Sequence, residues 1–140
     1  MRISLGAIVV FLFICQAWPQ ATPGAANVIG SWEGESKCTV PDSPCPDENA
    51  LYRITADKKN PAQLNIDGYK IVGGSPQFMG ALSCQYHADQ GKLNCTSNTG
   101  RQDDWEFHVS GDSMTGTLPL GADRTLYRRI TVRKKPSKES

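Results

Sequence analysis

The chain has 140 residues, of which 15 are Lys or Arg, 14 are Asp or Glu, and 39% are hydrophobic. This length predicts one domain with a small core, and the near-neutral charge leads us to expect no specific nucleic-acid partner. Six of the basic residues lie from Arg128 onward. We therefore expect a basic tail over 134–140, and we expect Arg133, Lys134, Lys135 and Lys138 to make at most a weak contact with an anionic surface.

The first 21 residues have the pattern of a secretory signal peptide. Arg2 precedes an apolar run from Ile3 to Ile14, and small residues follow it. The run is shorter than the roughly 20 residues that a transmembrane helix needs. We expect cleavage after Ala17 or Ala21, a flexible N-terminal segment over 22–27, and a secreted or periplasmic protein.

Four cysteines remain after such cleavage, and an even number in a short exported chain predicts disulfides. If residues 88–91 form a turn, positions whose numbers sum to 179 face each other, which pairs Cys84 with Cys95. Cys38 and Cys45 flank a short loop that two prolines stiffen, and we expect these two residues to form the second disulfide. The spacing contains no C-x-x-C pair, so we expect no metal site and no cofactor.

The rest of the chain has the alternation and turn residues of short strands. We expect strands over 28–37, 50–56, 62–66, 77–86, 92–97, 103–110, 113–119 and 124–133. Asp67-Gly68 either turns the chain and makes 69–72 an extra strand, or bends one longer strand. The predicted fold class is all-β, a single antiparallel up-and-down meander barrel of about eight strands over 28–133. An open two-sheet sandwich is the alternative.

Two turns and an inward face follow from the same pattern. Gly111-Asp112 fits a two-residue hairpin loop, and Gly91 fits the left-handed end of a four-residue loop. Alternation predicts a crowded interior, so we expect no tightly held lipid. The inward set is Trp32, Tyr52, Ile54, Leu64, Phe78, Leu82, Tyr86, Leu93, Trp105, Phe107, Met114, Leu118, Leu126 and Ile130.

Gly30-Ser31-Trp32 at the start of the first strand resembles the Gly-x-Trp signature of lipocalin-like (calycin) barrels, and the chain is similar to small bacterial members of that group. The resemblance implies that an arginine on the last strand packs across the tryptophan and closes the barrel. Gly30, Trp32 and Arg128 are the expected structural signature, with Arg129 as the rival for the arginine.

Catalytic chemistry is hard to assemble from this sequence. His87 and His108 lie apart, and no serine or cysteine nucleophile can be given a base. We therefore expect a non-enzymatic, monomeric binding or envelope-associated module, with an unknown protein or a small apolar ligand as partner. The alternative is a protease-inhibitor-like, protein-binding barrel that acts through its loops or N-terminal segment.

Overall fold

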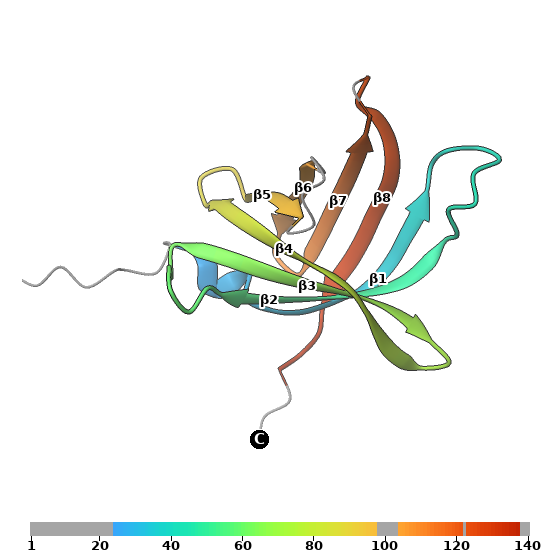
Figure 1. Ribbon diagram of the computed structural model, residues 1–140. Coiled ribbons are helices and arrows are strands. Elements are labelled where there is room, and N and C mark those ends of the chain that lie inside the picture. The colour runs from blue at the N-terminus through green and yellow to red at the C-terminus, as the bar shows by residue number, and fades with distance from the viewer. Residues whose placement is uncertain (1–23, 98–103, 122, 138–140) are drawn as a thin grey trace, which may run out of the picture.

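The computed structural model describes residues 24–97, 104–121 and 123–137. The signal peptide expected over 1–21, and Lys138, lie outside the described residues. A 3₁₀ helix, η1 (Ala25–Asn27), precedes eight strands (Figure 1). The strands are β1 (Gly30–Cys38), β2 (Glu48–Ala56), β3 (Gln63–Val72), β4 (Ser75–His87), β5 (Lys92–Ser97), β6 (Asp104–Ser110), β7 (Ser113–Leu120) and β8 (Thr125–Lys134).

The strands form one closed antiparallel barrel in sequence order, because β1 pairs with β2 on one side and β8 on the other. The predicted all-β up-and-down barrel is therefore confirmed, and the sandwich is excluded. Closure pairs the first strand with the last and leaves no edge between them. The two expected turns are also present: Ser110 pairs with Ser113 across Gly111-Asp112, and His87 pairs with Lys92.

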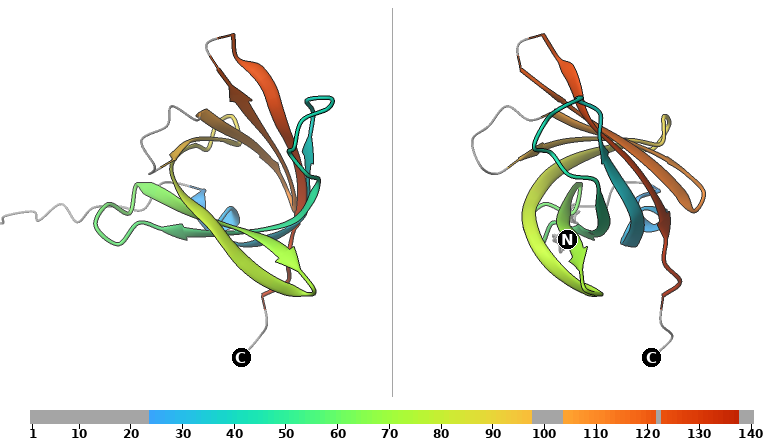
Figure 2. Two further views of the ribbon diagram at one scale, coloured as in Figure 1. Left: turned by 45° about the vertical axis from the view of Figure 1, so that its right-hand side comes forward. Right: turned by 90° about the vertical axis from the view of Figure 1, so that its right-hand side faces the viewer.

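The Asp67-Gly68 stretch continues one long strand rather than turning the chain. β3 runs through it to Val72, and the turn falls at Gly73-Gly74, where φ is 57° and 80°. Both residues thus adopt the left-handed conformation that a tight hairpin requires and glycine favours. The β3–β4 hairpin reaches beyond the neighbouring strands (Figures 1 and 2).

Two β-bulges interrupt the alternation. Gly68 pairs with Gly80 but Tyr69 pairs with Phe78, so Met79 is an extra residue in β4. An extra residue turns the following side chains to the opposite face. The expectation that Phe78 points inward is therefore wrong: its side chain is exposed and packs edge-on against Tyr69.

The second bulge lies in β8. Leu118 pairs with Arg128 but Pro119 pairs with Leu126, which leaves Tyr127 as the extra residue. Leu126, expected inside, is only half-buried. The core is formed by the residues between the two ends of the barrel, where alternation is unbroken. Its largest fully buried side chains include those of Trp32, Phe107, Ile54, Leu64, Ile66, Leu93, Met114 and Ile130.

One end of the barrel is closed by the N-terminal segment. Ala25 in η1 and Val28 after it are buried in the core. Of the segment over 22–27 that we expect to be flexible, Ala25–Asn27 form this helical turn, and Ala25 packs against the core. Figure 1 shows η1 opposite the end that carries the β1–β2, β3–β4 and β7–β8 turns. That second end is called the mouth below.

Both expected disulfides are present. Cys84 and Cys95 are directly opposed on β4 and β5, with Cα atoms 4.1 Å apart, and Cys38 and Cys45 close the β1–β2 loop. Two disulfides in so short a chain are consistent with an oxidising environment such as the extracellular space.

Candidate functional site

Trp32 closes the barrel end that η1 covers. Its side chain is fully buried, and its indole N–H donates to the Val28 carbonyl at 2.9 Å. Lys134 Nζ lies 5.6 Å from the centre of the indole ring and donates to the Asn27 carbonyl at 2.6 Å. This ammonium group therefore joins the last strand to the helical turn and makes a cation–π contact with Trp32.

Gly30 makes room for that contact. Its φ is 136°, a conformation that side-chain-bearing residues rarely adopt, and a Cβ there would lie 3.2 Å from Lys134 Cε. The glycine of the Gly-x-Trp triplet thus leaves the space through which the lysine reaches the indole.

The expected stacking of Arg128 on Trp32 is wrong, and Arg129 does not replace it. Trp32 is paired with Lys134, whereas Arg128 is paired with Cys38 at the other end of β1. Arg129 is exposed. Antiparallel pairing is the reason, because the start of the first strand must meet the end of the last strand rather than its beginning.

Arg128 lies instead at the mouth, beside a cavity of about 400 Å³ that every strand helps to line. This volume falls in the range of small-molecule sites. The lining residues are Ser36, Glu48, Ala50, Tyr52, Gly68, Tyr69, Met79, Gly80, Ala81, Leu82, Ser97, Trp105, Leu118 and Arg128. The sequence predicted a crowded interior and gave no sign of where a cavity would lie.

A pair of glycines creates this space. One row of inward residues across β2, β3 and β4 is Ile54, Ile66 and Leu82, which fill the barrel with three large side chains. The next row toward the mouth is Tyr52, Gly68 and Gly80. A Cβ on Gly80 would meet no atom within 4 Å. The missing side chains leave the wall hollow opposite Tyr52.

A polar cluster forms one side of the cavity. Arg128 Nη1 donates to the carbonyl and hydroxyl oxygens of Ser36 at 3.3 and 3.1 Å, and Nη2 donates to the Pro46 carbonyl at 3.0 Å. Glu48 Oε2 lies 3.7 Å from Nη1. Ser36 is 2% exposed, the one buried polar residue in the described part of the chain. Burying such a group is tolerable because it is hydrogen-bonded.

Tyr52 adds a phenol to this cluster. Burial raises the pKa of Tyr52 to about 12, although its hydrogen bond with Ser36 and the charge of Arg128 oppose the increase. The phenol therefore stays protonated at neutral pH. Its ring packs edge-on against Phe107, 5.7 Å between centroids, and Phe107 is parallel to Trp105 at 6.1 Å. The rings of Tyr52 and Trp105 line the cavity, and Phe107 joins them in the core.

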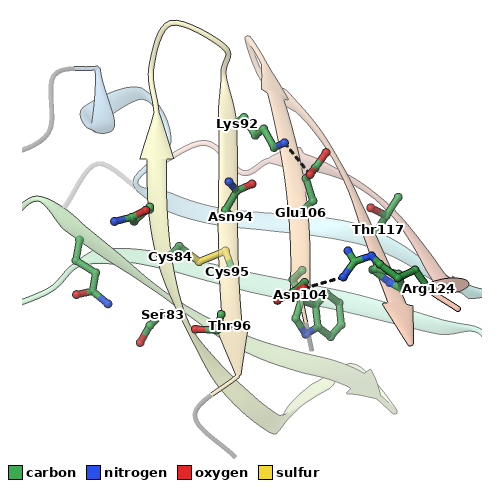
Figure 3. Close-up of a pocket in the computed structure, with 14 residues that line it drawn as sticks. Ser83, Cys84, Lys92, Asn94, Cys95, Thr96, Asp104, Glu106, Thr117 and Arg124 are labelled. Atoms are coloured by element: carbon green, nitrogen blue, oxygen red, sulfur yellow. Dashed lines mark hydrogen bonds and ion pairs between the residues drawn. A yellow bond between two sulfur atoms is a disulfide. The ribbon is translucent and has the colours of Figure 1, made fainter. Parts of the chain in front are cut away.

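A second hollow, of about 540 Å³, lies on the outer face of the sheet around β5 and β6. Figure 3 shows Lys92 directed toward Glu106 and Arg124 toward Asp104, at 2.8 and 2.7 Å. These charges neutralise one another at a solvated surface. The mouth cavity, enclosed by strands and lined by aromatic and aliphatic side chains, is the better candidate for a ligand site.

The remaining candidate residues do not assemble a reactive centre. His87 contacts Asn94, and His108 pairs with Glu106 on the outer face. Within 24–97, 104–121 and 123–137, no three His, Cys, Asp or Glu side chains gather to hold a metal ion. Over the same ranges, no helix is long and apolar enough to span a membrane.

The basic residues near the C-terminus have partners in part. Lys134 belongs to β8 rather than to a tail, and its ammonium group is used at the closed end. Lys135 pairs with Glu33. Arg133 is exposed. A weak contact with an anionic surface stays a prediction, now centred on fewer side chains.

Comparison with known proteins supports the fold. No protein-family model and no curated protein match the chain. Twelve chains of solved structures match it, among them a de novo designed fluorescence-activating β-barrel. That designed chain is 17% identical, the match covers 79% of this chain and 96% of the other, and the TM-score is 0.50. The likeness shows an eight-stranded barrel, a geometry that fits the calycin type.

Proposed function

We propose that this protein is an exported, non-enzymatic binding module that holds a small, largely apolar molecule in the mouth cavity. The carrying observation is the asymmetry of the barrel. One end is closed by η1, Trp32 and Lys134, while the other holds a cavity of about 400 Å³ beside Arg128. An eight-stranded barrel that is not completely filled has room for one such ligand.

The protein-binding alternative has less support. A protease-inhibitor-like barrel would act through its loops or its N-terminal segment, and in the N-terminal segment Ala25 and Val28 are buried against the core. The segment before residue 24 is outside the described residues, so this alternative stays a prediction.

The proposal is tested with N-phenyl-1-naphthylamine, an uncharged dye whose fluorescence rises in apolar surroundings. We expect saturable binding of one dye per chain. Gly68→Ala and Gly68→Leu fill the cavity in two steps, because a Cβ at Gly68 would make ordinary contacts of 3.6 Å with the Tyr52 ring and the Gly80 carbonyl. We expect weakened binding with Ala and at least a tenfold loss with Leu.

The control addresses the exposed apolar side chains outside the cavity. Phe78 is 60% exposed, and Phe78→Ser should leave dye binding unchanged. Circular dichroism should show that all three variants are folded. Binding that persists in Gly68→Leu, or that disappears in Phe78→Ser, would contradict the proposed site.

A further inference from the structure

We propose that the mouth cavity is specific for a small aromatic or apolar amine, whose ammonium group binds Glu48. This inference rests on the proposed binding function and assigns the chemical class of the ligand. The evidence is the hydrogen bonding of the polar cluster. Arg128 donates hydrogen bonds to protein oxygen atoms, whereas no hydrogen-bond donor within the described residues reaches the Glu48 carboxylate.

Arg128 is already held by the protein. Three of its hydrogen bonds go to oxygen atoms of Ser36 and Pro46, at 3.0 to 3.3 Å. Its guanidinium group thereby ties β8 to β1 and to the end of the β1–β2 loop. These bonds turn its donors toward the wall of the barrel, so Arg128 acts as a structural cation more than as a receptor for an anionic ligand.

Glu48, unlike Arg128, is not held by side-chain hydrogen bonds within the described part of the chain. Its side chain is 19% exposed, and its contact in the described part of the chain is the 3.7 Å approach to Arg128, which is too long for a hydrogen bond. An ionised carboxylate has about four acceptor sites. Glu48 lines the cavity, so a donor group on a bound molecule can supply what the protein does not.

An ammonium group brings three N–H donors to a carboxylate, so it can supply the hydrogen bonds that Glu48 lacks in the described part of the chain. The arene or alkyl part would lie against Tyr52 and Trp105, which line the same cavity. Their ring faces also attract a nearby cation. A carboxylate ligand would approach Glu48 with the same sign of charge, and an alcohol would supply one donor without charge.

The test compares 2-phenylethylamine, 2-phenylethanol and 3-phenylpropionate as competitors of the bound dye at pH 7. We expect the amine to bind at least tenfold more tightly than the alcohol, because its ammonium group brings a positive charge and three N–H donors to Glu48, whereas the alcohol brings one uncharged donor. The acid should bind most weakly. Glu48→Gln should remove at least tenfold of the amine's affinity and change that of the alcohol less than twofold.

Glu35→Gln is the matched control, since Glu35 is an exposed glutamate on β1 that pairs with Lys37. It should leave all three affinities unchanged. Equal binding of amine and alcohol, tightest binding of the acid, an amine affinity that survives Glu48→Gln, or failure of all three to displace the dye overturns the amine assignment. Absence of dye binding instead overturns the proposed function.

Discussion

The closed end of the barrel makes a quantitative prediction about which cation stabilises Trp32. Trp32→Ala should cost about 3–5 kcal/mol, as expected for removing a fully buried aromatic side chain. The orphaned Val28 carbonyl adds about 1 kcal/mol. Since a domain of this kind has a total stability of about 5–15 kcal/mol, a milder substitution, Trp32→Leu, is the practical choice for combining with a second change.

A double-mutant cycle separates the two candidate cations. Trp32→Leu combined with Lys134→Met should give a coupling energy of about 0.5–2 kcal/mol, because the ammonium group lies 5.6 Å from the ring centre. Arg128 pairs with Cys38, which lies six residues beyond Trp32 on β1. At about 3.3 Å per residue, this places Arg128 roughly 20 Å from Trp32. Its coupling with Trp32 should stay within about 0.5 kcal/mol.

Urea unfolding followed by circular dichroism is the appropriate assay, because Trp32 itself contributes to the fluorescence. Arg128→Met is the comparison variant. A larger coupling to Arg128 than to Lys134 would refute the arrangement at the closed end.

Three further predictions follow. Gly116→Ala should destabilise the protein by about 1–3 kcal/mol in the same assay, because a Cβ there would lie 2.6 Å from the buried Phe107 ring. The pKa of Glu106 is lowered by Lys92 and then by His108. The ionised Glu106 side chain therefore stabilises the fold above about pH 4.5, and this contribution is lost as the pH falls through its lowered pKa in the folded state. Glu106→Gln should reduce the loss of unfolding free energy at acid pH by less than about 1 kcal/mol, since the side chain is 41% exposed. Native mass spectrometry should find no stoichiometric lipid; a co-purified lipid would contradict the expectation of a small ligand.

Much of the barrel could be predicted because the strands near the closed end keep a regular alternation and hairpin register. Counting outward from the Gly91 turn pairs Cys84 with Cys95 without further information, since hairpin register is fixed by its turn. Alternation correctly places Trp32 and Phe107 inside. The partner of Trp32 could also have been predicted from the sequence. Antiparallel closure pairs the start of the first strand with the end of the last strand, and Lys134 lies there.

The mouth could not be predicted in the same way, because both bulges lie toward it. Met79 and Tyr127 each add one residue to a strand, and a period-two pattern has no signal for such an insertion. The cavity also depends on Gly68 facing Gly80, a register relation between two strands that neither strand reveals alone. Bulges are common next to functional sites, where a fold departs from its most regular geometry. The end at which alternation fails is thus the end at which the barrel has space, an acceptor and aromatic walls for a ligand.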